Sequence, residues 1–237
     1  MENTPSPPRI HANLDTNLLK LIAVIAMACD HAGLALFPQF QFLRLIGRIA
    51  FPLFAYCLVV GSLYTHDIRR YMLRLGIFAL VSQPFYILLT DPDLSHFVAN
   101  LPNLNIFFTL LAGLGAVTAL QKRNWWLLAF VLTASYILSL DYGLYGVALM
   151  LLFYCFRFYR GRSALAVTLY LAAQFFTGGL PLDGTDLGLQ GFAVLAVPLI
   201  YCNTAVYPKI PRYFFYGFYP AHMLLLYLIR LLLPTVG

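Results

Sequence analysis

The feature that most constrains this chain is a succession of apolar segments, each near the roughly 20 residues that a helix needs to cross a bilayer. We place about nine of them, of which the sixth and the seventh are short. They cover residues 18–37, 43–63, 71–90, 104–120, 124–140, 144–159, 163–178, 189–206 and 213–233. The loops between them are short, so the pattern predicts an all-α, polytopic transmembrane helical bundle.

The composition also indicates an integral membrane protein. Of 237 residues, 61% are hydrophobic and 10% are charged, whereas soluble domains carry about 25% charged residues. No polar stretch reaches the roughly 50 residues of a separate soluble domain. We therefore expect a flexible cytoplasmic segment at residues 1–17, followed by one transmembrane domain at residues 18–237.

The charged residues orient the predicted helices. Lys and Arg mark cytoplasmic loops, and here they fall on every second connection, while the intervening loops contain acids and no Lys or Arg. With nine spans, this pattern places the N-terminus in the cytoplasm and the C-terminus outside. Topology accounts for most of the net charge of +6, so the expected surroundings are membrane lipid, with no nucleic-acid partner.

Two ionisable residues, Asp30 and His31, interrupt the first segment. An Asp at the centre of a spanning helix costs about 2.5–3.5 kcal/mol to insert. Neighbouring side chains point about 100° apart around a helix, so both must face protein or a wet cavity. A polar cluster that holds helices together is one explanation. Intramembrane ionisable groups, however, are by default functional, and this favours a reactive site.

Arg48 in the second segment is the candidate partner for Asp30. The helical rise puts Asp30 roughly 10 Å and Arg48 roughly 7 Å below the outer ends of their helices. A short turn makes these helices antiparallel neighbours, so we predict an Asp30–Arg48 ion pair. Arg44 shares a face with Arg48 and on its own is typical of an interfacial residue. Pro52 removes the helical partner of the Arg48 carbonyl, which is typical of a kink.

Lys20 and His31 are eleven residues apart, which is almost a whole number of helical turns. They therefore project from one face, about 16 Å apart. Lys20 alone is typical of a lysine that sets topology at the membrane surface. Together with His31 it describes a track from the cytoplasm into the membrane.

Four stretches of the chain resemble the TraX family: LKLIAVIAMACDHAG, LRLIGRIAFPLFAY, YMLRLGIFALVSQPF and FYPAHMLLLYLI. TraX proteins are associated with N-terminal acetylation of conjugative pilin. They are related to the transmembrane acyltransferases, which include the acyltransferase-3 proteins and the lysosomal heparan acetyltransferases. The acyltransferase-3 pattern, a basic residue and ten others followed by His, is matched by Lys20 and His31. Those proteins usually have ten helices, whereas nine are expected here.

The resemblance implies an acetyl-CoA-dependent acyltransferase of the bacterial inner membrane. Its acceptor would be an amine or hydroxyl outside the cytoplasm or within the membrane, such as the N-terminus of a pilin-like protein. His31 would be the catalytic base, because His is the commonest general base near neutral pH, and Asp30 would assist it. The other implied site residues are Lys20, Arg69, Arg70 and Arg74 for CoA, and Arg44, Arg48, Asn105 and His222 for substrate binding or charge pairing, with no metal.

Several alternatives stay open from the residues alone. Asn105 fits a helix cap, and His222, two residues after Pro220, fits a hydrogen-bonded side chain within the bundle. The same buried Asp, His and Arg set also suits a small-molecule or proton-coupled transporter, although nine spans do not divide into two equal inverted repeats. A structural partner in a larger membrane assembly is a third class.

Overall fold

The structure is a computed structural model, and it describes residues 10–177 and 186–233. The secondary structure of these residues is helical, apart from one isolated bridge between Leu104 and Leu140. The helices in chain order are α1 (Thr16–Ala35), α2 (Gln41–Gly47), α3 (Ala50–Tyr64), α4 (Ile68–Thr90), η1 (Leu94–His96), α5 (Ile106–Gln121), α6 (Trp125–Ile137), α7 (Gly143–Cys155), α8 (Arg160–Ala172), α9 (Gln174–Thr177), η2 (Asp186–Leu195), α10 (Ala196–Tyr201) and α11 (Arg212–Leu232).

Each predicted apolar segment contains a helix, but the helices differ in length. Within the described residues, four stretches are long and apolar enough to be candidate spans: Thr16–Ala35, Gln41–Tyr64, Ile68–Thr90 and Tyr213–Leu232. Shorter apolar helices occupy Ile106–Gln121, Trp125–Ile137, Gly143–Cys155 and Leu189–Tyr201. The all-helical membrane class is therefore present, while nine spans and the orientation of the termini stay predictions.

The second predicted segment, 43–63, is broken at Arg48 and Ile49 into α2 and α3. Pro52 lies four residues after Arg48 and has no N–H, so it cannot donate the helical hydrogen bond that the Arg48 carbonyl would accept. The Nε of Arg48 folds back along α2 and donates to the carbonyl of Arg44 at 3.2 Å. The break therefore sets the direction of the Arg48 side chain.

The eighth predicted segment, 189–206, ends earlier than its hydropathy suggested. It forms the 3-10 helix η2 and the short α10, and the helix stops at Tyr201. The backbone N–H groups of Val206 and Tyr207 donate to the Asp15 carboxylate, at 3.0 Å and 2.9 Å. These two N–H groups are therefore satisfied by a distant carboxylate in place of a helical carbonyl.

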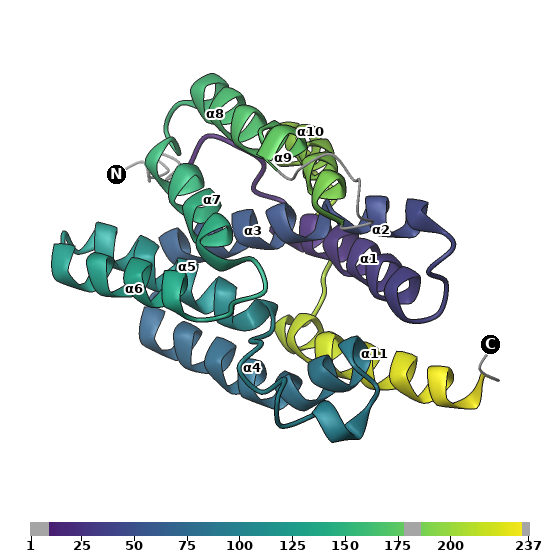
Figure 1. Cartoon of the computed structure of the whole chain (residues 1–237). Helices are drawn as coiled ribbons and strands as arrows, with labels where there is room; N and C mark the ends of the chain where they lie inside the picture. Colours follow the sequence, from purple (N-terminus) through teal and green to yellow (C-terminus); the bar gives the residue numbers. More distant parts are fainter. Residues whose placement is uncertain (1–9, 178–185, 234–237) are drawn as a thin grey trace, which may run out of the picture.

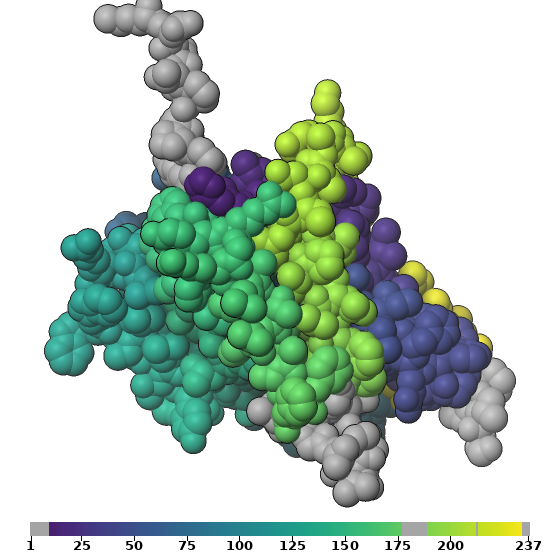
Figure 2. All heavy atoms as spheres, turned by 90° about the horizontal axis from the view of Figure 1, so that it is seen from above, coloured from purple at the N-terminus to yellow at the C-terminus, as the bar shows by residue number. Residues whose placement is uncertain are grey.

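The predicted flexible segment, residues 1–17, differs from the structure over its second half. Residues 1–9 lie outside the described residues, but Ile10 and Asn13 are buried and α1 already begins at Thr16. The side-chain amide of Asn13 donates to the carbonyl of Leu199 and to the hydroxyl of Thr204, both at 3.1 Å. Figure 2 shows the first described residues (dark purple) next to the green and yellow-green segments, the second of which covers the residue numbers of these partners.

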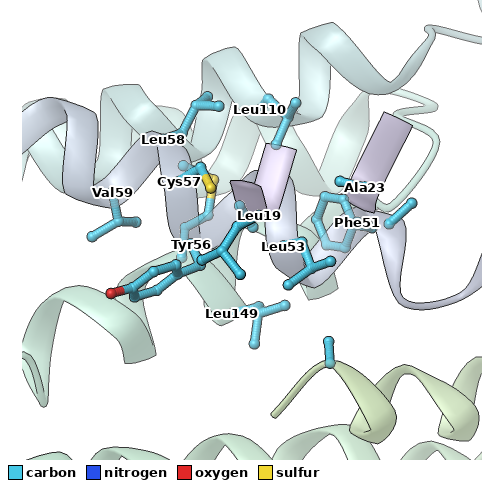
Figure 3. Packing of buried hydrophobic residues seen from close by; sticks show 14 of the residues in the cluster. Leu19, Ala23, Phe51, Leu53, Tyr56, Cys57, Leu58, Val59, Leu110 and Leu149 are labelled. Carbon is cyan, nitrogen blue, oxygen red and sulfur yellow. The ribbon is translucent and has the colours of Figure 1, made fainter. Parts of the chain in front are cut away.

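The hydrophobic core lies where α1 and α3 pack together in the middle of the bundle. Figure 1 shows α7 to α10 on one side of these two helices and α4 and α11 on the other. Figure 3 shows the packing of the core between α1, α3, α5 and α7. Its labelled side chains include Leu19, Leu53, Tyr56 and Leu149, which are at most 1% exposed. Tyr56 keeps its hydroxyl satisfied by donating to the Asn13 carbonyl at 2.6 Å.

Asp15 ties α1 to the chain that precedes α11, and replacing it with alanine is expected to lower stability by about 2 kcal/mol. The carboxylate caps α1 by accepting from Leu18 N–H at 3.2 Å, and a cap alone contributes about 0.5–2 kcal/mol. The Asp67→Ala variant is the matched control, because Asp67 caps α4 through one exposed hydrogen bond to Arg70 N–H. Thermal unfolding in detergent measures the stability of both variants. If Asp15→Ala and Asp67→Ala lose the same amount of stability, Asp15 does not join α1 to the chain that precedes α11.

The same carboxylate gives this stability a pH dependence. Burial alone would raise the pKa of Asp15, but the N–H donors of Tyr207, Leu18 and Val206 together hold it below its usual value. A group whose folded pKa is depressed contributes stability above its unfolded pKa of about 3.9 and loses it as the pH falls through the folded pKa. The difference in stability between the parent protein and Asp15→Ala should therefore persist at neutral pH and shrink in strong acid.

Candidate functional site

The carboxylate of Asp30 is held by two arginines from α2 and its C-terminal end. Arg48 Nη2 donates to Asp30 Oδ1 through a short ion pair, and Arg44 Nε lies 3.5 Å from the same oxygen. Arg48 Nη1 also donates to Gln190 Oε1 at 3.3 Å. The predicted Asp30–Arg48 ion pair is present, and it joins α1 to α2 and η2.

Gly47 allows this ion pair to form. A Cβ atom added at Gly47 would collide with the Cβ and the carboxyl group of Asp30. Only a residue without a side chain lets α2 approach α1 this closely. Gly33 has the same role on the other helix, because an added Cβ would come within 3.0 Å of the Leu43 side chain.

His31 is oriented by a second histidine, His222 of α11. The Nδ1 of His31 and the Nε2 of His222 are 2.7 Å apart, and the rings are nearly parallel, at 8°. The Nδ1 of His222 lies 2.8 Å from the carbonyl oxygen of Phe218, and a carbonyl only accepts. His222 therefore donates from Nδ1 and accepts at Nε2, which assigns the proton of His31 to its Nδ1 and leaves its Nε2 as an acceptor.

This arrangement changes the role expected for Asp30. The family resemblance implied that Asp30 assists His31, but adjacent side chains on a helix diverge. Asp30 instead faces the arginines, and His222 bonds His31. His222 was expected either to take part in substrate binding or charge pairing or to be hydrogen-bonded within the bundle; the structure shows the hydrogen bond, and its partner is His31.

A cavity of about 410 Å³ extends along α1 from Lys20 to His31, and we call it the Lys20 cavity. By the helical rise these two positions are about 16 Å apart. Arg74 lies at the Lys20 end, and its buried Nε has no hydrogen-bond partner among the described residues. The middle of the cavity is apolar and is lined by Met27, Phe54, Leu58, Leu75, Ile106 and Leu110.

A second cavity, of about 390 Å³, lies beyond His31, and we call it the Arg44 cavity. Its lining includes Leu34 near the end of α1, Thr90 at the end of α4, and Gln174. Four residues line both cavities: Asp30, His31, Asp141 and Tyr142. The reactive groups identified from the sequence in α1 therefore lie where the two cavities adjoin, with each cavity extending toward opposite ends of the helices.

Asp141 and Tyr142 reach this junction from the loop between α6 and α7. Tyr142 stacks on Phe51, with ring centroids 3.9 Å apart. Enclosure by protein raises the pKa of Asp141 to about 6; the Arg48 charge opposes this shift and the Asp30 charge adds to it. The Asp141 side chain is nevertheless exposed, because it faces open cavity space.

The remaining predicted site residues lie elsewhere. Arg69 and Arg70 are exposed, and Arg70 pairs with Asp67 at 3.0 Å, so of the four residues assigned to CoA only Lys20 and Arg74 line the Lys20 cavity. Asn105 is the buried N-cap of α5, and its side-chain amide donates to the Ala79 carbonyl and to Gln83 Oε1, both at 2.8 Å. It lines neither cavity, so the helix-cap interpretation is the one that the structure supports.

The sequence patterns predicted no site role for Asp141 or for Gln190. No motif spacing connects either residue to α1, so only the fold could bring them to Asp30 and His31. Among the described side chains, no group of three His, Cys, Asp or Glu residues is placed to hold a metal ion.

A known protein family matches a range that includes nearly all of the helices described above. A family model described as TraX protein matches residues 15–230. The chain belongs to the TraX family. This TraX-family protein is 30% identical over 238 residues to the "Probable fimbrial assembly protein FimC, serogroup H1" of Dichelobacter nodosus, with 88% of this chain and 92% of the relative covered.

A second relative matches a much shorter stretch. An uncharacterized protein of Rickettsia prowazekii (strain Madrid E) is 55% identical over 40 residues, which is 17% of this TraX-family chain and 16% of the relative. No solved structure matches the chain. The family is thus assigned from sequence, and the geometry of its site comes from the structure described here.

Proposed function

We propose that this TraX-family protein is an integral membrane acyltransferase that moves an acetyl group from acetyl-CoA to an amine or hydroxyl acceptor. The observation that carries the proposal is the position of His31 between two cavities, with its Nε2 assigned as an unprotonated acceptor. A base at this point can act on an acceptor in one cavity and a thioester in the other. General base catalysis of this kind contributes about 10²–10⁴-fold to a rate.

The Lys20 cavity suits the donor. CoA combines anionic phosphates with a long, less polar arm that ends in the thioester. Lys20 and Arg74 supply positive charge at one end, and phosphate groups form strong charge-assisted hydrogen bonds to such side chains. The apolar middle would enclose the arm, and the thioester carbonyl would then reach His31 and the Asp30–Arg48 pair. Arg48, which lines the Arg44 cavity next to the junction, would polarise that carbonyl.

The Arg44 cavity suits the acceptor, because it extends from the junction toward the opposite ends of the helices. The relative from Dichelobacter nodosus is named a fimbrial assembly protein, which favours a pilin-like acceptor outside the cytoplasm. In this proposal the protein is a multi-pass protein of the bacterial inner membrane. Lys20 faces the cytoplasm, where acetyl-CoA is made, and the Arg44 cavity opens to the other side.

The experiment is an assay of purified full-length protein with radiolabelled acetyl-CoA, measuring CoA release and labelled product. Release of CoA that depends on His31 supports the acyltransferase. Uptake of a solute into proteoliposomes without CoA release would support the transporter instead and would contradict the proposal.

The proposed orientation gives a separate expectation. Reporter fusions after residues 68, 122, 160 and 209 should report a cytoplasmic location, and fusions after residues 93, 141 and 185 an external one. The reason is the alternation of basic and acidic connections, since basic loops are retained in the cytoplasm. One inverted pair of fusions would remove a short helix from the spanning set and move the C-terminus inside.

A further inference from the structure

Asp141 is a carboxylate in the protein interior that forms no direct ion pair within the described part of the chain, although the charge of Arg48 acts on it from a distance. Among the described residues, no Lys, Arg or His nitrogen lies within ion-pair distance of it, whereas Asp30 has two arginines within 3.5 Å. It is exposed to the cavity space on both sides of the junction. A charge enclosed in this way is stabilised best by an opposite charge from a ligand.

The loop that carries Asp141 is held in place by its backbone. The N–H of Asp141 donates to the Leu104 carbonyl at 3.0 Å, and the N–H of Leu104 donates to the Ser139 carbonyl at 2.8 Å. The next residue, Tyr142, donates its N–H to the Thr109 hydroxyl at 3.3 Å. Asp141 therefore projects into the cavities from a fixed position, as a binding residue requires.

The ion pairs at the junction leave Asp141 without a direct partner among the described residues. Asp30 is matched by Arg48 and Arg44, and the orienting bond to His222 describes a neutral His31. The other polar groups near Asp141 are the hydroxyls of Tyr86 and Tyr142, which are neutral. The two arginines and the two carboxylates sum to zero net charge, but both arginines lie against Asp30, so Asp141 is the carboxylate that a ligand can neutralise by direct contact.

Resting on the proposed acyl transfer, we infer that Asp141 binds the acceptor as a protonated primary amine and takes the first of its protons. An amine is mostly an ammonium ion at neutral pH, and an ammonium ion has no lone pair with which to attack a thioester. It must lose two protons before an amide is formed. The junction offers two acceptors for them, the Asp141 carboxylate and the Nε2 of His31.

The step balances with these two groups. The ammonium ion gives one proton to Asp141, and the resulting amine attacks the thioester carbonyl, forming the C–N bond. The C–S bond breaks as the nitrogen gives its second proton to His31 Nε2, which passes it to the departing thiolate to make CoA–SH. Asp141 then releases its proton to water in the Arg44 cavity. The raised pKa of Asp141 suits a group that must hold a proton briefly near neutral pH.

The test uses octylamine as a charged probe and 1-octanol as its uncharged counterpart, with full-length protein. We measure binding of each by calorimetry, and acetyl transfer to each from radiolabelled acetyl-CoA. The Asp141→Asn variant should bind octylamine at least about tenfold more weakly, the effect typical of losing a hydrogen bond to a charged group. It should bind octanol as the parent protein does, and Asp141→Glu should recover much of the octylamine affinity.

Asp93→Asn is the matched control, because Asp93 is an exposed acid of another loop and lines neither cavity. The inference is overturned if the parent protein binds octylamine no better than octanol, or if Asp141→Asn binds both probes as the parent does. Octylamine binding that depends on Asp141, without any CoA release, would contradict the acyltransferase and leave the amine site standing. CoA release that depends on His31, together with octylamine binding that Asp141→Asn does not change, would support the acyltransferase and overturn the amine site at Asp141.

Discussion

Replacing His31 with alanine is expected to lower acetyl transfer by at least about 10²-fold, because it removes the positioned base. The variant should remain folded. His31 donates one hydrogen bond, to His222, and the net contribution of such a bond is about 1 kcal/mol. Donor binding should survive, since Lys20 and Arg74 lie at the other end of the cavity. Turnover of acetyl-CoA and donor affinity, determined separately, check this expectation.

Two further variants separate the roles along this track. Lys20→Ala should weaken donor affinity more than it slows the chemical step, because Lys20 lies about 16 Å from His31 by the helical rise. His222→Ala should give a smaller loss of rate than His31→Ala, because it removes only the group that fixes the His31 tautomer. Normal turnover in His31→Ala would show that the base lies elsewhere, and His222 would become the first candidate.

The largest losses of stability should come from the ion pair at the junction. Asp30→Asn removes the negative charge beside the buried Arg48 guanidinium, whose other hydrogen-bond partners among the described residues are the Arg44 carbonyl and Gln190. Breaking a buried ion pair from one side costs about 3–5 kcal/mol. Arg48→Ala should cost less, because Asp30 retains Arg44 at 3.5 Å. We therefore expect Asp30→Asn to lose more stability than Arg48→Ala. Thermal unfolding in detergent measures this difference.

The double variant Asp30→Asn with Arg48→Ala should recover stability better than it recovers activity, because it leaves neither of these two charges stranded. Arg70→Ala is the control, since the Arg70–Asp67 pair is exposed and such pairs contribute little. If both single variants at the junction unfold at the same temperature as the parent protein, Asp30 and Arg48 do not stabilise each other.

The sequence by itself determined the membrane class and the helical content. It also determined the relations of the site that lie within one helix or between two adjacent helices. The ion pair between Asp30 and Arg48 followed from helical rise and a short turn, because both residues lie on adjacent helices. The track from Lys20 to His31 followed from one helix alone. The helical period fixes relations of this kind without knowledge of the rest of the fold.

The tertiary structure alone decided which distant residues complete the site. His222 meets His31 because α11 packs against α1, and Asp141 reaches the junction because its loop pairs with the backbone of Leu104. Hydropathy does not encode which helices become neighbours, since an apolar helix face can pack against many others. Hydropathy also could not show that residues 202–206 leave the helix, since this outcome depends on the distant carboxylate of Asp15. The break in the second segment, in contrast, agrees with the kink that Pro52 indicated from the sequence.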